Sequence, residues 1–366
     1  MLRTLTPRSR RILMTVDAVG GVWRYALDLA RELVKGGDSV LLAGVGPQPS
    51  SQQAEEAQSF TTLIWLNTPP DWMTRNADDL DALSHELHAP IRDHAIDLVH
   101  LNAPTQAAMF DAPCPVVVVS HSCVVTWFHA VKGQAVDGAW AWQMERNRRG
   151  FDRADAVIAP SRSHADMLGT CYGPIGRLSI VGNGARPVPK AERRQPLVFA
   201  AARWWDEGKN AAVLDQAAPL IEWPIFAAGS MQGPDGQRAV FKHAVPLGPL
   251  PYEEVRSLMT RAGIFVSPSL YEPFGLAVLE AATSSIPLVL ADIPTYRELW
   301  DGAALFFDAR DPHDLARCIG RLSSDAQRRR EFGEAAARRS RKFSLARQAV
   351  AMRGVYDKAA SAMAGR

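Results

Sequence analysis

Residues 267–281 have the sequence Ser267-Pro-Ser-Leu-Tyr-Glu-Pro-Phe-Gly-Leu-Ala-Val-Leu-Glu-Ala281, which joins an expected strand to an expected helix. The apolar run 263–266 before it is typical of a buried strand, and residues 276–282 have the composition of a well-packed helix. The backbone N–H groups of residues 274–276 therefore precede the first helical turn. At that position they lack intrahelical partners and can bind an anion or a sugar hydroxyl. The stretch predicts a ligand site where a strand meets a helix.

Two carboxylates accompany this junction. Glu272 lies in the turn, and Glu280 lies eight positions further on, inside the expected helix. At about 3.6 residues per turn, this spacing places the two side chains roughly 80° apart around the helix axis. One carboxylate can then bind one end of a ligand while the other binds the far end. A capped surface helix with two solvated carboxylates is the structural alternative.

The same stretch resembles the donor-site signature of the retaining glycosyltransferases of family 4, which have the GT-B fold. The match is residue for residue at Glu272, Phe274, Gly275, Leu276 and Glu280. The resemblance implies that Glu272 contacts the transferred sugar and that Glu280 holds the ribose of the nucleotide. It also implies that the Phe-Gly-Leu turn lies against the sugar and the diphosphate. The resemblance is strong over residues 196–310 and looser over the first part of the chain.

The chain length and the order of its apolar runs predict two domains of α/β type. A chain of 366 residues exceeds what a single core usually supports. Strand-like and helix-like runs alternate almost throughout, which favours parallel sheets. The expected strands are 11–15, 63–65, 98–101, 116–119, 157–159 and 178–181 in the first half, and 198–201, 225–228, 244–247, 264–266 and 288–290 in the second. We therefore expect two Rossmann-like domains that face each other across a cleft, as in GT-B enzymes.

A polar, proline-bearing segment at 183–194 is the expected linker. We expect an N-terminal, acceptor-side domain at residues 1–190 and a C-terminal, nucleotide-sugar-binding domain at residues 191–343. A helical segment at 344–366 follows. The resemblance to GT-B enzymes implies that this last helix crosses back onto the first domain.

The first half supplies two candidate contributions to the site. Gly20 and Gly21 lie in the loop after the first strand, and although this loop lacks the glycine spacing of a dinucleotide site, the resemblance implies that it covers the donor diphosphate. A second glycine pair at 44–46 is interpreted as a loop only. His121 follows the strand 116–119, at the edge where open α/β sheets bind ligands. A lone histidine is usually structural, but the resemblance implies that His121 contacts the donor sugar.

The second half supplies the cations. Arg203 and Lys209 lie between a strand and a helix, in a segment similar to the one with which family 4 binds the nucleotide diphosphate. Preorganised cations stabilise the negative charge of a departing nucleoside diphosphate, so no metal site is expected. Trp127, Trp140 and Trp142 form an expected acceptor wall, since aromatic rings stack on sugar faces, although they also form ordinary cores.

Composition narrows the class of protein. A hydrophobic share of 47% and a charged share of 22% are those of a soluble globular enzyme, and a net charge of +2 is too small to predict nucleic acid as a partner. Basic residues at 328–330 and 338–342 favour a solvated helix face, with a membrane surface or a phosphate-rich partner as the alternative. No segment approaches the about 18 apolar residues of a membrane span. We expect a cytoplasmic protein, with peripheral membrane contact and oligomeric state left open.

The sequence as a whole predicts a hexosyltransferase-type glycosyltransferase that moves a sugar from a nucleoside diphosphate sugar to a sugar, glycan or lipid-linked acceptor. The resemblance implies retention of the anomeric configuration. The nucleotide sugar is a co-substrate, and no further cofactor is expected. The candidate catalytic residues are His121, Arg203, Lys209 and Glu272. The alternatives are a GT-B nucleotide-sugar epimerase or phosphorylase, or a nucleotide-sugar-binding protein without turnover.

Overall fold

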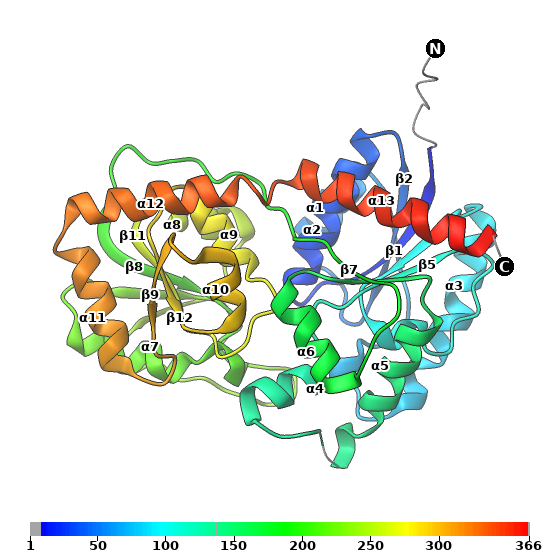
Figure 1. The fold of residues 1–366 in the computed structure, drawn as a ribbon, viewed down its shortest axis with the longest axis horizontal. Helices are drawn as coiled ribbons and strands as arrows, with labels where there is room; N and C mark the ends of the chain where they lie inside the picture. The colour runs from blue at the N-terminus through cyan, green and yellow to red at the C-terminus, as the bar shows by residue number, and fades with distance from the viewer. Residues whose placement is uncertain (1–8, 137, 365–366) are drawn as a thin grey trace.

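The computed structural model describes residues 9–136 and 138–364, which form two lobes around two parallel β-sheets (Figure 1). The first sheet has the strand order β3-β2-β1-β4-β5-β6-β7, and the second has the order β10-β9-β8-β11-β12-β13. The order reverses once in each sheet, next to its first strand, which is the arrangement of doubly wound folds. The prediction of two Rossmann-like domains is confirmed.

The bounds of the elements follow the predicted pattern closely. The first sheet contains β1 (Arg11–Asp17), β2 (Ser39–Val45), β3 (Thr62–Trp65), β4 (Leu98–Leu101), β5 (Val116–Val119), β6 (Ala156–Ala159) and β7 (Leu178–Ile180). The second contains β8 (Gln195–Ala201), β9 (Ile225–Ala228), β10 (Val245–Gly248), β11 (Ala262–Ser267), β12 (Leu288–Ala291) and β13 (Ala304–Phe307). Every predicted strand overlaps an observed one, whereas β2 and β13 were not predicted.

Helices cover both faces of each sheet (Figure 1). Those of the first lobe are α1 (Gly21–Lys35), α2 (Ser51–Gln58), α3 (Ala82–Asp93), α4 (Val124–Trp127), α5 (Trp142–Arg153) and α6 (Arg162–Tyr172). Those that follow β8 are α7 (Ala211–Ala217), α8 (Tyr252–Arg261), α9 (Leu276–Thr283), α10 (Pro294–Trp300), α11 (Pro312–Ser323), α12 (Ala326–Ser340) and α13 (Leu345–Ala364). No helix in the described part of the chain is long and apolar enough to cross a membrane.

Residues 44–46 were interpreted as a loop, and this is wrong for residues 44 and 45. Gly44 and Val45 belong to β2, whose side chains are buried from Val40 onward. Gly44 is needed there because a Cβ atom at this position would lie 2.0 Å from the indole ring of Trp65 on the neighbouring strand. A glycine in a strand marks the close approach of a large side chain here.

The chain crosses between the lobes twice, and the two crossings lie together. Ala185, in the segment between β7 and β8, pairs with Ser344 through an isolated parallel bridge, just before α13 begins. Helix α13 then packs onto the first lobe, where Met352 and Tyr356 enter the hydrophobic core that contains α1 (Figure 1). The return of the last helix was predicted. The expected boundaries at 190 and 343 fall within these two crossings, while residues 1–8 and 365–366 of the predicted domains lie outside the described residues.

The basic residues of α12 are partly engaged by the protein itself. Arg329 donates to the backbone carbonyls of Leu322 and Ser323, and Arg339 donates to those of Leu299 and Asp301. These two arginines therefore fix neighbouring helix ends instead of facing solvent as the sequence suggested.

Candidate active site

A cleft of about 1490 Å³ lies between the two lobes. The loops after β1, β5, β8 and β11 line it, together with the first turn of α9. These loops follow the carboxyl ends of strands, and those after β1, β8 and β11 flank the switch points of the two sheets, where such folds bind ligands. The predicted site residues that line the cleft are Gly20, Gly21, His121, Trp127, Trp140, Arg203, Lys209, Glu272, Phe274, Gly275 and Leu276.

Lys209 and Glu272 form an ion pair in the second lobe. The Lys209 Nζ lies 2.5 Å from Glu272 Oε1, and the two side chains are only 15% and 18% exposed. Lys209 ends a short 3₁₀ turn whose start is fixed by Asp206, because Asp206 Oδ1 accepts from the backbone N–H of Gly208 at 2.9 Å. Ser269 lies at 3.4 Å from the same Glu272 oxygen. The pair thus places a positive and a negative charge side by side at a defined position in the cleft.

Arg203 reaches across the cleft toward the first lobe. Its guanidinium lies near the indole rings of Trp205, at 5.4 Å, and of Trp72 from the first lobe, at 5.8 Å. The two indoles are themselves nearly parallel, with ring centroids 6.4 Å apart. A Cβ atom built on Gly20 would lie 3.1 Å from Arg203 Nη1. The glycine loop and the arginine therefore meet face to face, with aromatic rings that limit where the guanidinium can move.

This close approach makes Gly20 a sharp test of the site. Gly20 has extended backbone (φ −149°), so alanine fits the backbone there but must displace the Arg203 side chain. We expect Gly20→Ala to lower kcat/KM roughly tenfold, because misplacing a catalytic charge by a fraction of an ångström is costly. Gly21→Ala should cost less, since its Cβ would meet only Leu276 at an ordinary 3.7 Å. Steady-state kinetics decide this, and a larger loss in Gly21→Ala would contradict the arrangement.

The turn before α9 is seated on the first lobe. Gly275 has a positive φ of +87°, which only glycine adopts without strain, and a Cβ atom there would approach the Tyr296 ring to 3.0 Å. Ser161, the N-cap residue of α6, donates from its hydroxyl to the Pro273 carbonyl at 2.7 Å, and the Tyr271 hydroxyl donates to Thr126 at 2.8 Å. The two lobes therefore hold the turn from both sides, and its backbone donors precede the first turn of α9 as the sequence predicts.

His121 follows β5 and lies in the cleft wall. Its Nε2 is 2.9 Å from Asn102 Oδ1, and its ring packs edge-on against Tyr25 with centroids 4.2 Å apart. Burial, helped by the nearby His100 and His164, lowers the pKa of His121 to about 3. The imidazole is therefore neutral near neutral pH, which makes it a hydrogen-bonding group and excludes a standing positive charge.

Glu280 is not part of the cleft wall in this conformation. Its side chain is 6% exposed and accepts a 2.7 Å hydrogen bond from the hydroxyl of Tyr252, the first residue of α8. The Arg24 guanidinium of the first lobe lies over the Tyr252 ring at 4.2 Å. Burial raises the pKa of Glu280 to about 7. The structure therefore places Glu280 behind the wall, beside a tyrosine that the sequence did not single out.

The raised pKa of Glu280 has a consequence for stability. A carboxyl with a higher pKa in the folded state favours folding when protonated, so its contribution is full below pH 4.5 and is lost as the pH rises through about 7. We expect wild-type protein to lose roughly 3 kcal/mol of unfolding free energy relative to Glu280→Gln across this window. Denaturant unfolding at several pH values measures this. Glu253→Gln, on the exposed side of α8, should follow the wild-type profile, and a superimposable profile for Glu280→Gln would contradict the assignment.

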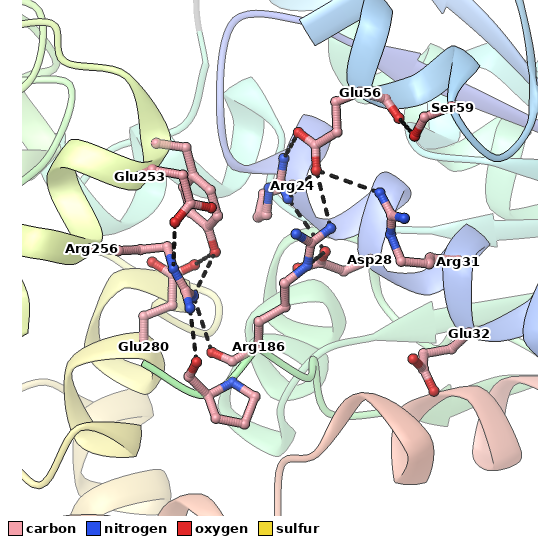
Figure 2. A network of polar contacts seen from close by, with 12 residues as sticks. Arg24, Asp28, Arg31, Glu32, Glu56, Ser59, Arg186, Glu253, Arg256 and Glu280 are labelled. Carbon is pink, nitrogen blue, oxygen red and sulfur yellow. Dashed lines mark hydrogen bonds and ion pairs between the residues drawn. The ribbon is translucent and has the colours of Figure 1, made fainter. Parts of the chain in front are cut away.

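Behind Glu280, an ionic network joins the linker to both lobes (Figure 2). The Arg186 side chain contacts Asp28 at 2.6 Å and Glu56 at 3.1 Å, both in the first lobe. Its backbone carbonyl and that of Pro187 face Arg256 of α8, with the Pro187 bond at 2.8 Å. Arg186 and Pro187 thereby connect the crossing segment to both lobes, close to Glu280.

One sequence expectation for the acceptor side needs revision. Trp142, the first residue of α5, is not among the residues that line the cleft, whereas Trp72 lines it from a 3₁₀ turn at Asp71–Met73. Trp72 lies close to a proline-containing stretch without periodicity, so the sequence carried no signal for it.

Two family models match the chain. The model described as Glycosyltransferase Family 4 matches residues 19–187, and the model described as Glycosyl transferases group 1 matches residues 237–339. The protein is a glycosyltransferase with the GT-B fold. This glycosyltransferase is 26% identical over 320 residues to the glycogen synthase of Mycobacterium tuberculosis, covering 75% of each chain. It is also 26% identical over 268 residues to the alpha-maltose-1-phosphate synthase of Mycolicibacterium smegmatis, which covers 62% of this chain and 69% of the relative.

Solved structures share the fold of the glycosyltransferase over nearly its whole length. The sucrose-phosphate synthase of Thermosynechococcus elongatus superposes with a TM-score of 0.82 at 18% identity, covering 98% of this chain and 100% of the other. HepE of Anabaena, in complex with UDP and glucose, superposes with a TM-score of 0.71 at 16% identity, covering 94% and 98%. The predicted GT-B fold is therefore confirmed, and the protein is an enzyme of the hexosyltransferase type.

Proposed function

We propose that the protein transfers a sugar from a nucleoside diphosphate sugar to a saccharide acceptor with retention of configuration, as in family 4. The observation that carries this proposal is that Arg203, Lys209 and the turn before α9 line one cleft, in which Arg203 and Leu276 lie against the Gly20-Gly21 loop. Cations and backbone donors aimed at one place suit a leaving diphosphate. The HepE structure with UDP and glucose and the one with UDP-glucose belong to the same fold and support a donor of this class.

The roles of the charged residues follow from their positions. We assign Arg203 and Lys209 to the diphosphate, Glu272 to the transferred sugar and Glu280 to the ribose. Because the Glu272 carboxylate is paired with Lys209 at 2.5 Å, we assign it a positioning and electrostatic role and not that of a nucleophile. The bond between the anomeric carbon and the phosphate oxygen breaks while the acceptor oxygen attacks the same face. The acceptor proton passes to the departing phosphate oxygen.

In this structure the Tyr252 hydroxyl is hydrogen-bonded to the Glu280 carboxylate, which we assign to the ribose. It donates to Glu280 Oε1 the kind of hydrogen bond that a ribose hydroxyl would donate. We propose that the donor nucleotide replaces this contact when it binds. The acceptor would then lie against Trp127 and Trp140 of the first lobe, where the rings offer faces for a sugar. We also propose that the domain boundaries lie at residues 190 and 343. A cytoplasmic location is proposed as well, and peripheral contact with a membrane is left open.

A thermal-shift screen against nucleoside diphosphates and their sugars tests the donor class. A ligand present at 100 times its dissociation constant should stabilise the protein by about 2.7 kcal/mol. Incubation of the best nucleotide sugar with candidate saccharides, followed by NMR of the product's anomeric proton, then tests retention. Binding without transfer to any acceptor would favour a binding protein, and release of product only with inorganic phosphate would favour a phosphorylase.

We further propose that transfer requires no metal ion. Arg203 and Lys209 supply the positive charge that Mg²⁺ or Mn²⁺ would otherwise bring to the diphosphate. Excess chelator should therefore leave initial rates nearly unchanged. Complete loss of activity in chelator that is restored by added Mg²⁺ or Mn²⁺ would contradict this proposal.

A further inference from the structure

The Tyr252 ring is contacted by guanidinium groups from both lobes. The Arg24 guanidinium, from α1 of the first lobe, lies 4.2 Å from the ring centre. The guanidinium of Arg256, one turn later on α8, lies 5.5 Å from the same point. The Tyr252 hydroxyl donates to Glu280 Oε1 at 2.7 Å. The side chain that covers the Glu280 carboxylate is therefore in contact with an arginine of the opposite lobe.

Arg24 is held firmly within the first lobe. Its two terminal nitrogens donate to the two carboxylate oxygens of Glu56 at 2.9 Å and 2.5 Å, and its Nη1 lies 3.4 Å from Asp28 Oδ1 (Figure 2). Only 11% of the Arg24 side chain is exposed. A bidentate pair of this kind fixes the orientation of a guanidinium. The distance from this cation to the Tyr252 ring is therefore set by the position of the first lobe.

The other contacts of the Tyr252 side chain belong to its own lobe. Arg256 is on the same helix, and its Nη1 lies 3.5 Å from the Tyr252 hydroxyl. A cation on an aromatic face is attracted to the ring, more strongly where water is excluded. A Tyr252 ring that turns away from Glu280 must also leave the Arg24 guanidinium. Displacing the hydroxyl from Glu280 is therefore harder while Arg24 is in place.

We propose that Arg24 and Tyr252 form a latch that competes with the nucleotide for the Glu280 carboxylate and makes nucleotide affinity depend on the position of the first lobe. This inference rests on the proposed function, in which Glu280 binds the ribose. A nucleotide must displace the Tyr252 hydroxyl and break the Arg24 contact before it can bind Glu280. The latch thereby lowers the affinity for the nucleoside diphosphate that remains after sugar transfer, and it favours release of this product.

Two variants remove the two parts of the latch separately. Tyr252→Phe keeps the ring next to Arg24 but removes the hydroxyl that donates to Glu280. Arg24→Met removes the cation and keeps an unbranched side chain. The carboxylates of Asp28 and Glu56 still pair with Arg186 in that variant, at 2.6 Å and 3.1 Å, so the ionic network retains a cation.

Arg31→Met is the matched control for Arg24→Met. Arg31 is on the same helix, lies 3.7 Å from Glu56 and covers an aromatic ring at 4.1 Å, but that ring is Phe60 of its own lobe. Calorimetric titration with UDP, ADP and GDP measures the nucleotide affinity of each variant. The titrations are made at a pH above the Glu280 pKa of about 7, where its carboxylate is mostly ionised.

We expect Tyr252→Phe to bind the preferred nucleoside diphosphate roughly threefold to tenfold more tightly than wild type, because one competing hydrogen bond to Glu280 is lost. Arg24→Met should tighten binding about threefold, because the contact with the ring no longer has to be broken. In the Tyr252→Phe background, Arg24→Met should add little, since the ring then need not turn away from Glu280. Arg31→Met should keep wild-type affinity.

Unchanged or weaker nucleotide binding by Tyr252→Phe would overturn the inference, because the hydroxyl would then not compete with the nucleotide. Fully additive effects of Tyr252→Phe and Arg24→Met would overturn it as well, since Arg24 would act independently of the hydroxyl. Equal tightening by Arg31→Met would show a general effect of charge and would also contradict it. These outcomes leave the proposed function intact, whereas failure of wild type and every variant to bind any of the nucleotides would overturn both.

Discussion

Replacing Arg203 or Lys209 with alanine should lower turnover roughly a hundredfold or more, because each supplies preorganised positive charge where the leaving diphosphate develops negative charge. Arg203 faces the Gly20 loop from across the cleft, and Lys209 lies beside Glu272. Steady-state turnover with the nucleotide sugar found in the binding screen measures the effect. Arg317→Ala removes an exposed arginine of the same lobe that pairs with Asp314, and it should retain wild-type turnover. Near-normal transfer by both site variants would contradict the diphosphate assignment.

The two cation variants should differ in stability. Lys209→Ala leaves the Glu272 carboxylate, only 18% exposed, without its cation, and breaking a partly buried pair in this way destabilises a protein. Arg203 is 38% exposed and its nearest carboxylate, that of Asp206, is 3.7 Å away. Melting temperatures measured alongside the kinetics should therefore fall in Lys209→Ala and change little in Arg203→Ala. The Arg203 variant is the cleaner measure of charge stabilisation.

Glu272→Gln should reduce transfer by roughly a hundredfold while leaving the affinity for bare nucleoside diphosphate at or above its wild-type value. The proposed partner of Glu272 is the sugar, which the bare diphosphate lacks. The substitution also frees Lys209 from a competing anion at 2.5 Å. Kinetics with the intact donor and titration with the bare diphosphate check the two halves of this expectation. Glu253→Gln, an exposed glutamate on α8 that pairs with Arg256, serves as the control and should change neither.

Much of this fold could be predicted because adjacent residues specify many of its strands and turns. The buried strands β4, β5 and β9 are short apolar runs bounded by turn residues, and their predicted bounds are exact. The turn before α9 is likewise specified by adjacent residues, because its last residue, Gly275, has a positive φ that glycine adopts without strain. Strand β2 escaped prediction because Gly44 suggests a loop until the indole of Trp65 is known to lie against it.

The rest of the site depends on contacts between residues that are distant in sequence. Trp72 and Trp205 come from different lobes, and neither has a local pattern that indicates their stacking. The Tyr252 hydroxyl covers Glu280 only because α8 and α9 are neighbours, and the same holds for the Asn102 amide that joins two histidines. The resemblance to family 4 identified the charged residues of the cleft, whereas their partners could be found only in the packed structure.

Calorimetric titration of bare nucleoside diphosphate and of intact nucleotide sugar into Glu272→Gln and Glu280→Gln tests the central claim, that the cleft binds a donor with the sugar at Glu272 and the ribose at Glu280. At a pH above the Glu280 pKa of about 7, where its carboxylate is mostly ionised, we expect Glu280→Gln to weaken both ligands alike, by about 1 to 3 kcal/mol for a lost hydrogen bond to a charged group. Glu272→Gln should weaken only the intact nucleotide sugar. If Glu272→Gln weakens the bare diphosphate as strongly as Glu280→Gln does, the turn before α9 binds phosphate and not sugar, and the proposed orientation of the donor is wrong.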